Sequence, residues 1–178
     1  MKKYILILFF ITLSITNFSI VRANIVFVDL DKIISISKAG KSIINQLEVL
    51  NKATIDDFKK TEKKLKDKEI KLIAQKNILS SSEYENNVRS LKTEINTYSK
   101  ERKVIIKKIN KLKLESTNKL LQQVNKVLIK YSEENSISII LQKKYIITGK
   151  SDLDISDDIL KLVNKNIKEF KIKWKKNL

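Results

Sequence analysis

The residues of this chain that could do chemistry are few, and two short Gly-Lys-Ser motifs are the first candidates. Gly40–Ser42 follows a strand-like run and opens a helical stretch, and Gly149–Ser151 follows a second strand-like run. A phosphate-binding loop needs another glycine five residues before the glycine of this motif. Those positions hold Ser35 and Lys144. The two motifs therefore favour glycines at a helix entry and at a turn over a nucleotide site.

An acidic cluster near the C-terminus is the second candidate. Asp152, Asp154 and Ser156 have the spacing with which a calcium-binding loop begins. Such a loop also needs a glycine at its sixth position and a glutamate at its twelfth, which here are Asp157 and Val163. Carboxylates that cap a helix and interact favourably with its dipole explain the cluster better.

The composition removes most other chemistry. The 178 residues include no His and no Cys, so the usual zinc ligands, redox pairs and most nucleophile–base pairs are missing. We predict that the protein is not an enzyme, with no catalytic residues, no metal site and no cofactor. With no Pro and only two Gly, few positions force a break, so long helices are expected.

Positive charge is the chemistry that remains. The formal net charge is +17, and residues 51–130 alone hold 21 basic and 10 acidic residues. A surface that only provides solubility would mix the two signs more evenly, so we interpret this excess as a binding field for anionic partners. The lysines expected to bind such a partner are Lys59, Lys60, Lys63, Lys64, Lys103, Lys107, Lys108 and Lys111.

The N-terminus predicts export. Residues 1–23 combine a basic start, an apolar stretch and a Val-Arg-Ala end, the pattern of a cleaved signal peptide. The alternative is an uncleaved membrane anchor, because the apolar stretch is nearly long enough to span. Removal of Lys2, Lys3 and Arg22 would leave a net charge of +14. An exported protein with this charge is expected to bind acidic polypeptide, anionic lipid or lipopolysaccharide, and no nucleic acid.

The lysines lie on what is predicted to be a helical hairpin over residues 41–132. Its helices are expected at Lys41–Leu79 and Ser82–Ser132, with the tip near residues 80–82 and a capping box formed by Ser82 and Glu85. Apolar residues recur at spacings of three and four residues, typical of an antiparallel coiled coil, with Arg102 in the one gap. They are Tyr84, Val88, Leu91, Ile95, Tyr98, Ile105, Ile109 and Leu112. Apolar residues near the tip that could contact a bound polypeptide are Leu72, Ile73, Leu79 and Tyr84.

Residues 24–40 and 133–178 are predicted to form a small β-rich body. Three strands are expected, Asn24–Leu30, Ile137–Leu141 and Tyr145–Thr148, the last two as a β-hairpin. Asp31 is expected to cap a short helical connection, and Gly40 to mark a bend. A final helix would place Ile159, Val163, Ile167, Phe170 and Trp174 on one face. So thin a core predicts self-association through Ile25, Phe27, Ile137, Ile139 and Leu141. The fold class is α+β, predominantly helical.

Both ends of the mature chain resemble the Skp (OmpH-like) family of periplasmic chaperones. The motifs are Val-Phe-Val-Asp-Leu with Ser37-x-x-Gly40-Lys41, and the closing Ile-Ser-Ile-Ile-Leu, Tyr-Ile-Ile-Thr and Asp154-Ile155-Ser156. The resemblance extends to about Asn166, and the basic tail from Ile167 to Leu178 runs past the usual end of the family. It implies a homotrimer whose β-rich body carries three helical hairpins that enclose unfolded outer-membrane proteins.

Two functions follow from these observations. The first, which the resemblance implies, is a periplasmic holdase that keeps unfolded outer-membrane proteins from aggregating without ATP. The second is an exported basic coiled-coil scaffold or adaptor that binds anionic envelope lipid. The tail favours the second, because a basic amphipathic helix with an interfacial Trp174 can lie on an anionic membrane.

Overall fold

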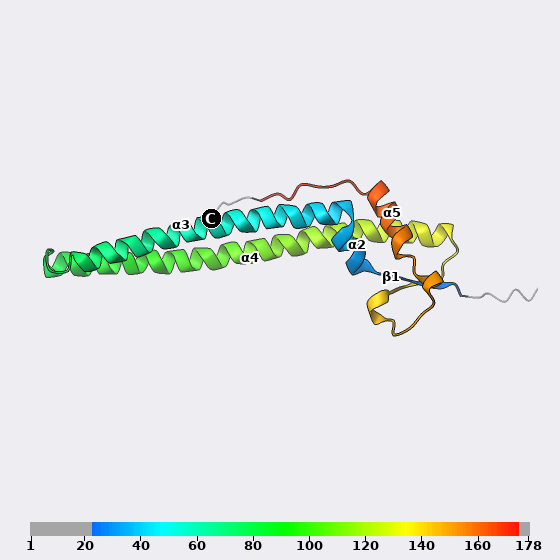
Figure 1. The fold of residues 1–178 in the computed structure, drawn as a ribbon, viewed down its shortest axis with the longest axis horizontal. Coiled ribbons are helices and arrows are strands. Elements are labelled where there is room, and N and C mark those ends of the chain that lie inside the picture. The colour runs from blue at the N-terminus through cyan, green and yellow to red at the C-terminus, as the bar shows by residue number, and fades with distance from the viewer. Residues whose placement is uncertain (1–22, 175–178) are drawn as a thin grey trace, which may run out of the picture.

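The computed structural model describes residues 23–174, so residues 1–22 of the predicted signal peptide lie outside it. Two long antiparallel helices, α3 (Lys38–Ala74) and α4 (Ser81–Glu134), form an arm that extends from a small body (Figure 1). The body contains strands β1 (Ile25–Val28) and β2 (Ile139–Gln142) and helices α2 (Leu30–Ile36) and α5 (Ser156–Asn166), with 3-10 turns at Lys143–Tyr145 and Ser151–Leu153. The predicted α+β, mainly helical class with a helical-hairpin arm is confirmed.

The turn at the end of the arm differs in detail from the prediction. Helix α3 ends at Ala74 instead of Leu79, and residues 75–80 make the connection. The capping box is formed by Ser80 and Glu83, so the predicted pair of Ser82 and Glu85 was wrong. Both serines stand three residues before a glutamate, and the earlier pair caps the helix because it satisfies the first free amides of the longer helix.

The entry to the arm depends on two side-chain caps. Asp29, rather than the predicted Asp31, caps α2 by accepting a hydrogen bond from Lys32 N at 2.8 Å. Ser37 caps α3 by accepting one from Gly40 N at 3.1 Å. Gly40 therefore lies inside the first turn of α3 and marks no bend before the helix. A Cβ there would come 1.7 Å from the carbonyl oxygen of Ile34, so the close approach of α2 to α3 requires glycine.

The sheet has two parallel strands instead of the predicted three with a hairpin. β1 pairs with β2 in the register Ile25↔Ile139 to Val28↔Gln142. The whole arm connects the two strands, and a long crossover of this kind is what parallel strands require. Residues 145–148 form no strand, because the chain turns away at Lys143–Tyr145. An isolated bridge between Phe27 and Asp154 brings the following loop back to β1.

The core lies where the arm joins the body. Ile33 of α2, Leu120 of α4 and Ile159 of α5 have no exposed surface, and Val28 of β1 packs with them. Four elements therefore bury one another at this end. Among the residues that the structure describes, no residue of α3 after Leu47 is buried, and none of α4 before Ile105.

The C-terminal helix is shorter than predicted. α5 ends at Asn166, so Ile167, Phe170 and Trp174 do not continue its apolar face. Residues 167–174 instead leave the body without helical structure and run along α3 in the direction of the tip (Figure 1). The hydrogen bonds and apolar contacts that hold this segment on the arm are described below.

Candidate functional site

The outer face of the two-stranded sheet carries the residues predicted to mediate oligomerisation. Ile25, Ile139 and Leu141 are exposed by 41%, 47% and 44%, and Ile25 pairs with Ile139 in the sheet. Phe27 differs, because it is buried beneath the loop that contains Gly149, and the Lys143 ammonium lies 5.9 Å from its ring centroid. The structure thus gathers exposed apolar side chains on one face of the sheet.

Ile137, the fifth predicted oligomerisation residue, is half-buried against the core. Sequence reasoning did not select Tyr145 and Ile147, which are exposed by 77% and 103% in the adjoining loop. They belonged to the predicted third strand. Their apolar side chains in a polar loop were the signal that could have identified them.

A polar network explains the acidic cluster that resembled a calcium loop. Asp154 accepts hydrogen bonds from Lys143 Nζ at 2.6 Å and from Ser156 N at 3.0 Å, and Ser156 Oγ accepts one from Asp29 N at 2.8 Å. Burial alone would raise the pKa of Asp154, but the hydrogen bonds from Lys143 and Ser156 outweigh it and hold that pKa below its usual value. The network ties the loop after β2 to β1 and to the start of α5. Within residues 23–174, no His, Cys, Asp and Glu side chains are grouped as metal ligands.

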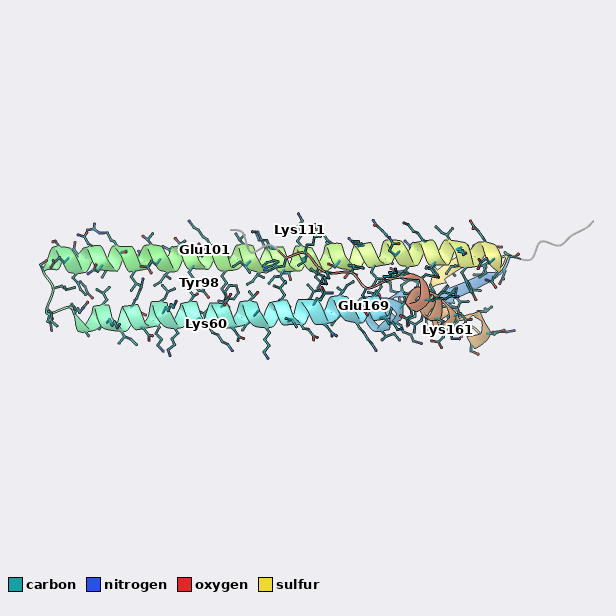
Figure 2. The ribbon with its side chains drawn as sticks, turned by 90° about the horizontal axis from the view of Figure 1, so that it is seen from above. Lys60, Tyr98, Glu101, Lys111, Lys161 and Glu169 are labelled. Atoms are coloured by element: carbon teal, nitrogen blue, oxygen red, sulfur yellow. The ribbon has the colours of Figure 1, made fainter. Side chains whose placement is uncertain are left out.

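Four side chains fix the register of the arm at its middle. Tyr98 of α4 donates a hydrogen bond to Glu62 Oε1 at 2.7 Å, and its ring meets Phe58 edge-on at a centroid distance of 6.2 Å. Arg102 lies over the Phe58 ring and forms an ion pair with Glu62 at 3.3 Å. Burial, together with Glu62, raises the pKa of Tyr98 to about 12. Figure 2 shows Tyr98 between the two helices. The sequence predicted Tyr98 as a seam residue but did not predict this clamp.

The candidate lysines form a basic belt around the middle of the arm. Glu62 pairs with Arg102, and Lys68 pairs with Glu94 at 2.6 Å. In this antiparallel register the lysines of residues 59–64 and those of residues 103–111 follow one another along the arm. Among the described residues no carboxylate pairs with Lys59, Lys60, Lys63, Lys64, Lys103 or Lys107, whereas Lys111 lies 3.8 Å from Glu115. We call the eight predicted lysines, which include the half-buried Lys108, the basic belt.

The predicted apolar residues near the tip share a groove. Leu72, Ile73 and Tyr84 line a groove of about 260 Å³ together with Val88, Leu91 and Ile95. Ile73 is exposed by 62%, and Leu79 lies outside the groove. The seam of the arm is therefore open to solvent on this side. Sequence reasoning assigned Leu91 and Ile95 to the seam only, because it could not show how incompletely one helix covers the other.

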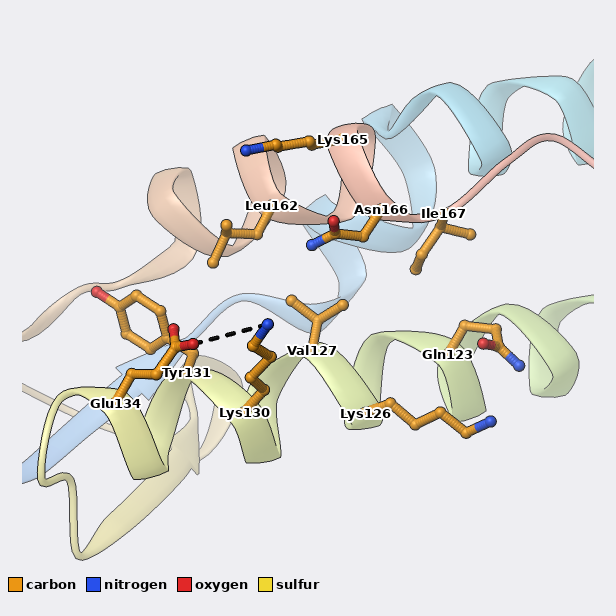
Figure 3. A pocket seen from close by; sticks show the side chains of 10 residues that line it. All are labelled: Gln123, Lys126, Val127, Lys130, Tyr131, Glu134, Leu162, Lys165, Asn166 and Ile167. Carbon is orange, nitrogen blue, oxygen red and sulfur yellow. Dashed lines mark ion pairs between the residues drawn. The ribbon is translucent and has the colours of Figure 1, made fainter.

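A second concave surface lies between the end of α4 and α5 (Figure 3). It has a volume of about 450 Å³ and is lined by Lys126, Lys130 and Lys165 beside Tyr131. Lys130 forms an ion pair with Glu134 at 3.7 Å. Lys126 and Lys165 point away from one another (Figure 3). The ammonium groups do not converge on one point, so this surface offers no assembled site for a single anion.

The chain is a protein with a small body and a much longer arm made of two antiparallel helices. The OmpH-like outer membrane protein family matches residues 24–163, and the chain belongs to that family. No curated protein matches the chain. Across residues 23–174 no helix is both long and apolar enough to cross a membrane.

A solved structure shares the fold. A protein from Caulobacter crescentus CB15, described as an OmpH-like outer membrane chaperone and solved at 2.83 Å, superposes with a TM-score of 0.79. The alignment covers 84% of this chain and 89% of the other at 14% sequence identity. At this identity the likeness shows a common fold.

Proposed function

We propose that the protein is a periplasmic holdase chaperone that binds unfolded outer-membrane proteins between its arms and prevents their aggregation. The observation that carries the proposal is the half-covered apolar seam of the distal arm beside a basic belt. Membership in the OmpH-like family supports the same function. Export depends on the predicted signal peptide over residues 1–23.

The arm combines the two properties that a holdase needs. The basic belt attracts acidic unfolded chains over a distance limited by salt, since the Debye length is roughly 8 Å at physiological ionic strength. The tip groove around Leu72, Ile73 and Tyr84 then offers apolar contact without a shaped pocket. Weak contacts of this kind hold many sequences and release them without a specific trigger.

Holding a client between arms requires more than one arm, and the sheet edge provides a means of assembly. Ile25, Ile139 and Leu141 expose apolar surface on this sheet, and within the described residues the outer edge of β2 has no strand partner, so it is prone to pair with another chain. We propose a homotrimer joined at this edge, as the family resemblance implies. The arms would then extend from one assembled body.

We propose that binding and release of unfolded chains need no nucleotide. The Gly40 amide, which a phosphate loop would use, already donates to Ser37 Oγ, and Gly40 is packed under Ile34 O. The alternative function as a lipid-binding scaffold depended on an amphipathic helix around Trp174. Residues 167–174 form no helix, so that argument no longer supports it.

An aggregation assay tests the proposal. An unfolded outer-membrane β-barrel protein is diluted from urea with and without the chain, and light scattering is followed in the absence of ATP. We expect scattering to be suppressed at a few trimers or fewer per client. Equal scattering in both samples would contradict the holdase function.

The matched variant for this assay is Ile139→Lys with Leu141→Lys. Both side chains are exposed in the single chain, so each chain should still fold. The charges should prevent assembly, and sedimentation should give a monomer that suppresses scattering poorly. The control Lys144→Glu changes charge next to the same strand and should leave the trimer intact. A variant that remains trimeric would contradict assembly through this edge.

A further inference from the structure

The last described residues of the chain, Phe170 to Trp174, follow a two-residue pattern. Phe170, Ile172 and Trp174 are half-buried, and Lys171 and Lys173 between them are exposed. This is the alternation of an extended strand with one face covered. The segment lies beyond residues 24–163, which match the family, so the family fold does not account for it.

The side-chain amide of Gln46 holds the backbone of this segment. Gln46 Nε2 donates to the Phe170 carbonyl at 3.1 Å, and Ile172 N donates to Gln46 Oε1 at 2.9 Å. One residue of a neighbouring parallel strand would bond the same two groups on either side of Lys171. Ser42 fixes the amide, because Gln46 Nε2 also donates to Ser42 Oγ at 3.1 Å.

The alternating side chains lie against both helices of the arm. Phe170 sits beneath the Lys119 ammonium of α4, which is 4.8 Å from its ring centroid. Ile172 and Trp174 complete a concave surface of about 470 Å³ with Val49, Leu50 and Ala53 of α3. Figure 2 shows the segment over the space between α3 and α4. We call the arm surface on which the segment lies, formed by Gln46, Val49, Leu50 and Ala53 of α3, the Gln46 groove.

The contacts in the Gln46 groove select for an extended backbone and do not require a particular sequence. An amide that bonds one carbonyl and one N–H accepts any extended chain, and an apolar surface beside it accepts alternate apolar side chains. Transmembrane β-strands have this same alternation of apolar and polar residues. Val49 is exposed by 71% even with the segment in place, so part of the apolar surface of the groove stays uncovered and could contact a larger side chain.

We propose that the Gln46 groove is a binding site for extended client segments with alternating apolar and polar residues, and that residues 167–174 occupy it as an internal competitor. This proposal rests on the proposed chaperone function and adds a specific site at the base of the arm. The tail keeps the groove covered until a client strand displaces it. A tail docked in nine of ten molecules would weaken client binding about tenfold.

Trp174 gives a direct readout, because it is the only tryptophan of the chain. The full chain is titrated with a Trp-free ten-residue peptide in which Phe, Ile and Val alternate with Ser and Glu. We expect Trp174 emission to shift to longer wavelength as the peptide displaces the tail. A peptide of the same composition with helical spacing should bind at least about tenfold more weakly. No shift, or equal shifts with both peptides, would overturn the proposal.

Three full-length variants test whether the tail competes with a client or only stabilises the arm. Binding is followed by the fluorescence anisotropy of a labelled alternating peptide. Phe170→Ser with Ile172→Ser should raise peptide affinity about tenfold, whereas the control Lys171→Ser with Lys173→Ser should not. Gln46→Ala should lose peptide binding while far-UV circular dichroism shows a folded arm. Unchanged affinity in the first or third variant would overturn the proposal. Because aggregation is measured separately, a protein that suppresses it normally while failing here would retain the proposed function without this site.

Discussion

The base and the distal part of the arm are built from the same two helices but differ in how completely their apolar residues are covered. At the base, Leu120 and Val124 of α4 have no exposed surface, because α2, α5 and β1 pack around them. In the distal part, Leu65 and Leu72 of α3 are only half-buried. There each helix has one partner, which covers one stripe and leaves its flanks in water.

This difference separates stability from binding. The base supplies the buried area that holds the fold together, since stabilisation increases with the apolar surface removed from water. The distal arm has little buried area, so it opens locally at low cost. Apolar side chains that are half-covered in the free protein can contact a client without disturbing the core. We therefore expect substitutions at the base to affect folding and substitutions along the arm to affect clients.

The largest expected effect is on the free energy of unfolding, when one leucine of the base and one of the distal arm are each replaced by alanine. Leu120→Ala leaves a cavity among four elements and should lower the free energy of unfolding by about 3 kcal/mol. Leu65→Ala, at a half-buried seam position, should lower it by only about 1 kcal/mol, because less surface returns to water. Urea denaturation of both variants measures the difference. Equal losses would show that the arm is as well packed as the base.

The sequence predicted the arm better than the body for a physical reason. A coiled-coil seam depends on local spacing, and the recurrence from Tyr84 to Leu112 specifies one helix and the need for a partner. The ends of the helices were less certain, because Ser80 and Ser82 both stand three residues before a glutamate. The sequence could not rank two caps of equal spacing.

The body and the tail depend on contacts between residues far apart in the chain. The strand-like run at residues 145–148 lost its partner because Lys143 binds Asp154 and turns the loop, a pairing that no local pattern shows. Phe170 and Trp174 fit a helical face by spacing, yet Gln46 binds the backbone of Phe170 and Ile172 and holds the chain between them extended. Residues four positions apart share a face both in a helix and in a strand, so this spacing could not distinguish the two. For the candidate site, the lysines and the tip residues were selected from their charge and apolar character alone. How far each of them is buried depends on the packing of the two helices and could not be predicted.

The next largest effect is expected on the rate of client association when the charge of the arm is changed and the base is left intact. Lys63, Lys64, Lys103 and Lys107 are replaced by Glu, which changes the charge by eight units per chain. Lys and Glu have similar helix propensity, so the arm should stay folded. The association rate with an acidic unfolded client should fall about tenfold at low salt, and its dependence on salt should weaken. Stopped-flow fluorescence at two ionic strengths measures both.

A matched pair of substitutions distinguishes electrostatic capture from apolar contact. Leu72→Ser with Ile73→Ser removes apolar surface from the tip groove and should raise the dissociation rate with little change in association. An unchanged association rate and salt dependence in the lysine variant would assign client capture to the apolar groove instead.

The smallest expected effect concerns the clamp at Tyr98, which holds the helices together where little else is buried. Tyr98→Phe keeps the edge-on contact with Phe58 but removes the hydrogen bond to Glu62, and should destabilise the arm by roughly 1 kcal/mol. Thermal melting followed by circular dichroism should show this loss. The control is Tyr84→Phe, because no hydrogen bond from the Tyr84 hydroxyl occurs within residues 23–174.

The pH dependence of the same variant identifies the hydroxyl as the cause. Burial, with Glu62, raises the pKa of Tyr98 from 10.0 to about 12, so the folded arm keeps a proton that the unfolded chain has lost. The contribution of this group is complete below pH 10 and is lost as the pH rises through about 12. Lysines titrate in both proteins, so the informative quantity is the difference in melting temperature between the wild type and Tyr98→Phe. That difference should be constant from pH 8 to 10 and should shrink toward pH 12. A difference that stays constant across the whole range would mean that Tyr98 steadies the arm through its ring alone.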